Sequence, residues 1–153
     1  MIIRPTEERD IAGIVAVLSA LVDAGKRTNP SDAVFVRDNY VAHPDRIASH
    51  VAIDQTGTVL GFQSLKRAGI GNRYDTPAGW GQIGTHIHPA AARRGIGKAL
   101  FAATRPAASA AGLPAIEAFI GATNTEGLAY YEAMGFSTYR RAKGAIAKCY
   151  PLG

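Results

Sequence analysis

The chain has 153 residues, of which 47% are hydrophobic and 19% are charged. These values are typical of one folded domain spanning residues 1–153, and they exclude a disordered chain. The formal net charge of +5 favours anionic partners, but a charge this small does not select nucleic acid over a phosphorylated metabolite.

The first part of the chain predicts one strand and two helices. Residues 1–5 form a short apolar run, and apolar residues recur at helical spacing over residues 11–22. That second run is too short to span a membrane, and acidic residues precede it, unlike a signal peptide. Because the single Cys149 is also typical of a reducing compartment, we expect a cytoplasmic protein. A second helix, starting near Ser31, should end at His43 and Pro44.

The middle of the chain predicts three strands. Residues 49–54 and 58–66 flank a short turn containing Gly57, which favours an antiparallel hairpin. Residues 67–79 are rich in Gly, Asn, Asp and Pro and predict a loop. A third strand follows over residues 80–88.

The remaining third predicts two helices and two or three strands. A helix is expected over residues 95–111, where Pro106 should kink or split it because proline lacks the backbone donor. A strand over 113–122, a helix over 124–135 and one or two closing strands complete the order β-α-α-β-β-β-α-β-α-β. This order predicts a mixed α/β sandwich.

The turn before the 95–111 helix has the composition of an anion site. A helix start offers unpaired N–H groups and a positive dipole end, which together bind phosphate. Gly95 and Gly97 would let the backbone approach the ligand, while Arg93, Arg94 and Lys98 would add positive charge. The alternative is that the glycines only permit a tight turn and that the arginines lie in solvent.

The standard nucleotide motifs are excluded at this turn. A dinucleotide fingerprint beginning at Gly95 would need a third glycine at Leu100. A P-loop would need glycine at Ala92 and Ser or Thr at Ala99.

Two segments, "IHPAAARRGIGKAL" and "NTEGLAYYEAMGF", resemble motifs of the GCN5-related N-acetyltransferase (GNAT) family. The first matches a strand end, His-Pro and a Gly-x-Gly turn opening a helix. The second matches an Asn, a helix carrying Tyr, and Gly-Phe, here Gly135 and Phe136. The element order agrees along essentially the whole chain. One departure is Ala92, which stands where the family usually has Gln or Arg.

This resemblance implies a GNAT-like fold, a mostly antiparallel mixed sheet with helices on both faces, and an enzyme that uses acetyl-CoA. Backbone amides of the turn would hold the CoA pyrophosphate, and the preceding strand end would pair with the pantetheine arm. A backbone N–H near Ile87 would stabilise the oxyanion. The cofactor contacts implied are Ile87, His88, Arg93, Arg94, Gly95, Ile96, Gly97, Lys98 and Asn124.

Two side chains are candidates for catalysis. The family's tyrosine falls on Tyr131, which would protonate the departing thiolate, while its neighbour Tyr130 is expected to pack. Many members use a Glu of the preceding strand as the base, but residues 80–88 contain none. The candidates for the base are His86, or a water relayed by Thr85 or Glu117.

Other interpretations remain open from the sequence. His86 and His88 alternate on one strand and would suit a metal, but no third ligand is evident. Nucleic-acid binding rests on net charge alone, because the aromatic residues do not interleave with Arg and Lys. A non-catalytic acyl-CoA-binding or sensor module would keep the turn and lose the chemistry. We therefore expect no metal, no nucleic acid and no membrane partner, and a homodimer is possible.

The acceptor is expected to be a primary amine of a small molecule or a peptide. The loop over residues 67–79 and the helix near Ser31 should line its pocket. Asp75 would hold a cationic amine, or it is simply a turn residue. The chain is also similar to members that acetylate amino-acid-like amines, such as the phosphinothricin-type acetyltransferases.

Overall fold

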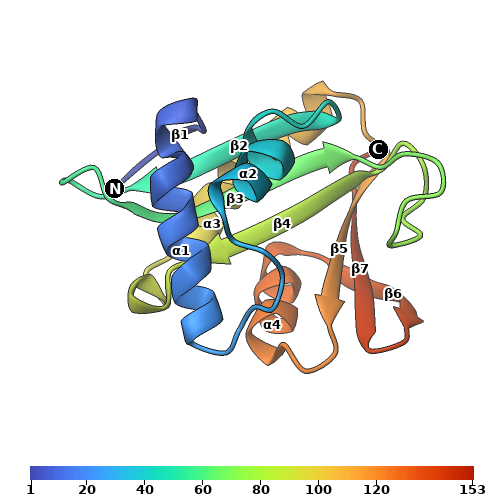
Figure 1. Ribbon diagram of the computed structural model, residues 1–153. Helices are drawn as coiled ribbons and strands as arrows, with labels where there is room; N and C mark the ends of the chain where they lie inside the picture. The colour runs from blue at the N-terminus through green and yellow to red at the C-terminus, as the bar shows by residue number, and fades with distance from the viewer.

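The computed structural model describes all residues, 1–153, as one seven-stranded sheet with helices on both faces (Figure 1). The strand order is β1-β2-β3-β4-β5-β7-β6, and only the β4–β5 pair is parallel. This arrangement confirms the predicted mixed, mostly antiparallel fold. The strands are β1 (Ile2–Pro5), β2 (Arg46–Ile53), β3 (Val59–Arg67), β4 (Gly81–Ile87), β5 (Ala115–Gly121), β6 (Ser137–Ala142) and β7 (Ala145–Pro151).

The helices divide between the two faces of the sheet. Helix α1 (Ile11–Asp23) and the short α2 (Ala33–Val36) cover one face, where Ile14 and Leu18 pack with Phe62 of β3. Helices α3 (Ile96–Ala110) and α4 (Thr125–Met134) cover the other face, where Phe101 of α3 packs with Ile116 of β5. Short helical turns over Glu8–Asp10, Arg37–Val41 and Pro89–Ala91 complete the chain.

The predicted hairpin and helices are present, with two refinements. The closing segment forms two strands, β6 and β7, rather than one. The helix expected near Ser31 is a single α-helical turn followed by a wider π-helical turn over Arg37–Val41.

The expectation that Pro106 kinks or splits its helix is wrong as regards splitting, because α3 runs unbroken past it. Pro106 and Ala102, whose carbonyl loses its donor, both lie on the exposed side of the helix. A carbonyl on the exposed side is open to hydration, and the packed face of the helix continues.

Candidate functional site

Strands β4 and β5 are paired only at their beginnings and then separate. The parallel ladder joins Gly81 to Ile116 and Gln82 to Glu117 and extends no further. Both strands continue, and Figure 1 shows them diverging toward the end of the sheet that faces α4. The edge of β4 beyond Gln82 is therefore open.

The backbone of β4 shows which groups face this open edge. The N–H of His88 donates to the carbonyl of Leu60 on β3, with a distance of 2.8 Å. Because backbone groups of an antiparallel strand alternate between its two edges, those of Ile87 and Thr85 face away from β3. They are the groups available to pair with an extended ligand in the gap.

The turn after β4 carries a run of backbone donors without partners. None of the N–H groups of residues 93–98 donates a hydrogen bond within the protein. Arg93 (φ 63°) and Gly95 (φ 73°) are in the left-handed region on either side of Arg94, which is not. Alternation of this kind turns successive N–H groups toward one concave side and forms an anion-binding nest at the start of α3.

Positions 95 and 97 of the turn are glycine for different physical reasons. At Gly95 the positive φ disfavours other residues, and a Cβ there would meet no atom within 4 Å. At Gly97 a Cβ would lie 2.5 Å from Cε1 of Tyr130. Position 97 is therefore glycine because an aromatic ring of α4 packs on it, whereas Gly95 has open space around it and lines the adjoining cavity.

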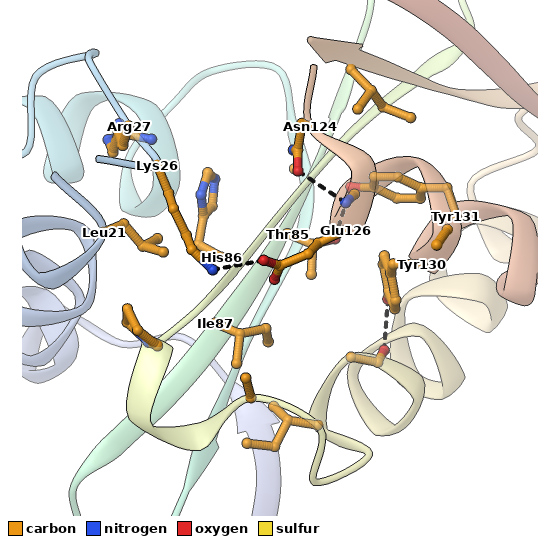
Figure 2. A pocket seen from close by; sticks show the side chains of 18 of the residues that line it. Leu21, Lys26, Arg27, Thr85, His86, Ile87, Asn124, Glu126, Tyr130 and Tyr131 are labelled. Carbon is orange, nitrogen blue, oxygen red and sulfur yellow. Dashed lines mark hydrogen bonds and ion pairs between the residues drawn. The ribbon is translucent and has the colours of Figure 1, made fainter. Parts of the chain in front are cut away.

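A cavity of about 860 Å³ joins the open edge of β4, the turn and the start of α4. Figure 2 shows its labelled side chains converging from α1, β4 and α4. The predicted site residues that line it are His86, Ile87, Arg93, Gly95, Ile96, Gly97, Lys98, Asn124 and Tyr131. The structure thus gathers residues from three separate segments around one space.

His88 and Arg94, both predicted to contact the cofactor, do not line this cavity. His88 Nδ1 accepts from the N–H of Ala90 at 3.0 Å and caps the turn over Pro89–Ala91. With its own N–H bound to Leu60, His88 holds the turn rather than presenting groups to the cavity. Arg94 lies on the other side of the turn.

Asn124 serves as the cap of α4, with Oδ1 accepting from the N–H of Gly127 at 3.0 Å. Its amide nitrogen has no partner in the protein, and Asn124 lines the cavity. Capping and contact with a ligand are therefore compatible.

Two tyrosines of α4 reach the cavity side by side. The hydroxyls of Tyr131 and Thr85 are 2.9 Å apart. Burial raises the pKa of Tyr131 and outweighs the opposing effect of the Thr85 hydrogen bond, so Tyr131 stays protonated at neutral pH. Tyr130 does not only pack, as the sequence led us to expect, because its hydroxyl donates to the carbonyl of Gly97 at 2.7 Å.

His86 lies on the other side of β4, among aromatic rings. Its ring stacks on Phe62 at a centroid distance of 4.8 Å and lies 5.8 Å from Tyr40. Burial, together with the positive charge of Arg27, lowers the pKa of His86 to about 3. The imidazole is therefore neutral and weakly basic at neutral pH, which weighs against its predicted role as general base.

Glu117, another candidate for relaying the amine proton, is held by two side chains away from the cavity. Its side chain is 1% exposed, one oxygen accepts from Arg140 at 2.5 Å, and the other accepts from Tyr139 at 2.9 Å. Glu117 does not line the cavity. Asp75 is an exposed turn residue with φ 57° and does not line it either.

Arg27, in the loop after α1, is a cavity residue that the sequence reading missed. Nη2 donates to the carbonyl of Pro30 at 2.8 Å, and Cζ lies 5.6 Å from the ring centroid of Phe35. Its Nε is buried without a hydrogen-bond partner, and no carboxylate pairs with it. Its neighbour Lys26 differs, because Nζ bonds Glu126 of α4 at 2.8 Å across the cavity (Figure 2). No pattern in the sequence distinguishes these two cations.

The chain contains no group of three or more His, Cys, Asp or Glu side chains arranged to hold a metal ion. The metal interpretation of His86 and His88 therefore still lacks a third ligand. No helix has both the length and the apolar character needed to cross a bilayer.

A parallel pair that opens beside a nest of free amides is the geometry that the motif resemblance implied. The model of the acetyltransferase (GNAT) family matches residues 14–136. The chain belongs to the GNAT family. It is thus an acetyl-CoA-dependent acetyltransferase, which disfavours the non-catalytic alternative.

Solved GNAT structures share this fold at low identity. A GCN5-related N-acetyltransferase from Kribbella flavida is 22% identical with a TM-score of 0.79, covering 99% of this chain and 97% of that one. A phosphinothricin acetyltransferase from Sinorhizobium meliloti, in complex with AcCoA, is 22% identical with a TM-score of 0.79, covering 99% and 88%. The yncA protein of Salmonella typhimurium, solved with its cofactor acetyl-CoA, is 20% identical with a TM-score of 0.72, covering 99% and 94%. No curated protein sequence matches the chain.

The environment of His86 predicts a pH dependence of stability. The pKa is 6.5 in the unfolded chain and about 3 in the folded protein, so the unfolded chain binds the extra proton between these values. The contribution of His86 to the free energy of unfolding is fully present above pH 6.5 and decreases as pH falls from 6.5 toward 3. Between pH 7 and 5 this contribution decreases by about 1–2 kcal/mol.

A His86→Phe variant keeps an aromatic ring against Phe62 and removes the titrating group. Between pH 7 and 5 the free energy of unfolding, measured in urea, should decrease in both proteins. We expect the decrease to be about 1–2 kcal/mol smaller in the variant than in the wild type. From pH 7 to 9 the two proteins should change in parallel. An equal loss in both proteins below pH 6.5 would contradict the assignment.

Proposed function

We propose that this GNAT transfers the acetyl group of acetyl-CoA to a primary amine by direct attack. The observation that carries the proposal is the run of free backbone N–H groups at residues 93–98, placed where the open edge of β4 ends. The turn would hold the diphosphate, and Ile87 and Thr85 would pair with the pantetheine amides as a neighbouring strand does. The Sinorhizobium and Salmonella structures, which hold acetyl-CoA, support acetyl-CoA as the donor.

The same geometry assigns the steps of the reaction. The amine nitrogen attacks the thioester carbon, and a backbone N–H of β4 near Ile87 stabilises the oxyanion. As the C–N bond forms and the C–S bond breaks, Tyr131 gives its hydroxyl proton to the thiolate. The ammonium loses one proton to water before the attack, the nitrogen loses a second to water after it, and solvent returns one proton to Tyr131. Acetyl-CoA and an ammonium ion thus yield an amide, free CoA and one proton.

Water fits the role of base better than His86 does. The lowered pKa of His86 leaves little driving force for taking a proton from ammonium, and Glu117 is held by Arg140. A water chain leading out of the cavity, or an amine that arrives partly neutral, requires no side-chain base.

The charges around the cavity favour an acceptor that also carries an acidic group. Arg27 is a cation without a carboxylate partner, and its buried Nε has an unused donor. Glu126 is paired with Lys26, so no free carboxylate is available for a polycationic acceptor. An amine with a carboxylate would satisfy Arg27 by charge-assisted hydrogen bonds. We place this reaction in the cytoplasm. A peptide amine is the alternative acceptor. We also propose that the enzyme can act as a homodimer.

The acceptor proposal is tested by thiol release from acetyl-CoA across matched amines. Each α-amino acid is paired with the amine that lacks its carboxyl group. We expect kcat/KM to favour the acids, and Arg27→Gln to reduce it roughly 10–100-fold for acids while leaving the simple amines unchanged. Arg73→Gln is the control, because Arg73 also stacks on an aromatic ring (Tyr74) but lies outside the cavity. Equal rates for acids and amines, or activity only on peptides, would overturn it.

Binding at the turn is tested by thermal shift. Coenzyme A should raise the Tm of the wild type, and Gly95→Glu should abolish the rise because a carboxylate would meet the diphosphate. Gly112→Glu is a matched control, since Gly112 has φ 71° and open space but lies beyond the other end of α3. The two variants carry the same backbone strain. A CoA-dependent rise that persists in Gly95→Glu would contradict the assignment.

The role of Tyr131 predicts a separation of chemistry from binding. Tyr131→Phe should lower kcat roughly 10²–10⁴-fold, because the thiolate loses its proton donor. The Kd for CoA, measured by calorimetry, should change little, since the ring remains packed against Phe136. Full activity in this variant would remove the acid assignment.

A further inference from the structure

Gln63, on β3, is a buried polar residue that neither the motifs nor the mechanism uses. Its side chain is 0% exposed and does not line the cavity. Its amide nitrogen donates to Thr85 Oγ1 at 2.9 Å and to the Tyr130 hydroxyl at 3.0 Å. Burying a polar amide costs free energy of folding unless its hydrogen bonds compensate. The two hydrogen bonds of Gln63 are therefore the feature to explain.

The carbonyl of Gly97 fixes the direction of the two hydrogen bonds that Tyr130 makes. The oxygen of Gly97 can only accept, so Tyr130 must use its single hydroxyl proton to donate to it. Towards Gln63, Tyr130 can therefore only accept. This fixes the amide orientation with the nitrogen facing both Tyr130 and Thr85. The opposite orientation would set two acceptors against each other, because Tyr130 has one proton and would face both the Gln63 oxygen at 3.0 Å and the Gly97 oxygen at 2.7 Å.

The amide then occupies one acceptor site of the Thr85 hydroxyl. One N–H of Gln63 is committed to Tyr130 and the other to Thr85 Oγ1. Because Thr85 accepts from Gln63, its own proton is free to point at Tyr131, 2.9 Å away. The Gln63 carbonyl oxygen is buried with no partner, as expected if the residue is kept for its donors.

The last member of the chain is Tyr131. Either hydroxyl can donate across the 2.9 Å contact between Thr85 and Tyr131. When Thr85 donates, the O–H proton of Tyr131 is not used within the group and remains available to the cavity that Tyr131 lines. Were the order reversed, Tyr131 would donate to Thr85, and its proton would point away from the thioester sulfur.

We propose that Gln63 is a positioning residue that orders these hydroxyl protons so that Tyr131 always presents its own to the leaving thiolate. The inference rests on the proposed acid role of Tyr131. It also links the two halves of the site, because the order begins at Gly97, within the turn that would hold the diphosphate. Gln63 touches neither substrate and acts only through Thr85 and Tyr131.

Two substitutions test the order. Gln63→Met has a similar volume and no donors, so the Thr85 proton is no longer directed. Gln63→Glu, when ionised, only accepts and draws the Thr85 proton away from Tyr131. At saturating acetyl-CoA we expect kcat to fall roughly 3–10-fold in Gln63→Met and 10–100-fold in Gln63→Glu, below the roughly 10²–10⁴-fold expected for loss of the general acid itself. The Gln63→Glu loss should deepen as pH rises and the buried carboxyl ionises, whereas Gln63→Met should keep the wild-type pH profile.

The decisive readout is the same pair of substitutions in a Tyr131→Phe background. If Gln63 acts through Tyr131, either change should have almost no further effect on kcat there, because the proton it orders is gone. The same fold-loss in both backgrounds would mean that Gln63 only supports folding, and would overturn the proposal. If Gln63→Glu does not fold, Gln63→Met carries the same cycle.

The proposal and the acid assignment fail differently. Wild-type kcat in both Gln63 variants, together with a large loss in Tyr131→Phe, would overturn the proton order and leave the acid intact. Wild-type kcat in Tyr131→Phe would remove the acid and the proton order together.

Discussion

The separation of β4 from β5 is the constraint on which the site depends. A sheet normally satisfies the backbone of each interior strand from both sides. Here a parallel pair two residues long holds the strands together at one end, and β4 then continues with β3 on one side and no strand on the other. The unpaired edge leads directly into a turn whose amides also lack partners. An extended ligand with amides along its length and a diphosphate at its end would satisfy both the unpaired edge of β4 and the free amides of the turn.

The two faces of the opened sheet offer different chemistry. On the α3 and α4 face, hydroxyls and one amide form an ordered group around Thr85, with Tyr131 at its end. On the α1 and α2 face, aromatic rings surround a neutral His86 beside Arg27. A thiolate leaving group needs a proton donor, and an acidic acceptor needs a cation, so each face suits one half of the transfer. The Lys26–Glu126 ion pair joins the loop after α1 to α4 across the cavity between them.

The fold and the turn could be predicted from sequence because their signals are local. Helical and alternating periodicity gave the element order, and Gly95 with its basic neighbours marked the anion site. Roles that depend on distant contacts could not be predicted. Gly97 is small because of Tyr130, which lies 33 residues away, and Gln63 meets Tyr130 across 67 residues. Pro106 does not split α3 because the affected carbonyl faces solvent, and the sequence alone does not show that face.

If backbone amides of residues 93–98 hold the diphosphate while β4 pairs with the adjoining arm, those amides respond first when coenzyme A binds. An amide-resolved NMR titration with coenzyme A measures this response. We expect the largest chemical-shift changes at the amides of residues 93–98, followed by those of Thr85 and Ile87. Saturable binding that leaves these amides unmoved and shifts another region would contradict it.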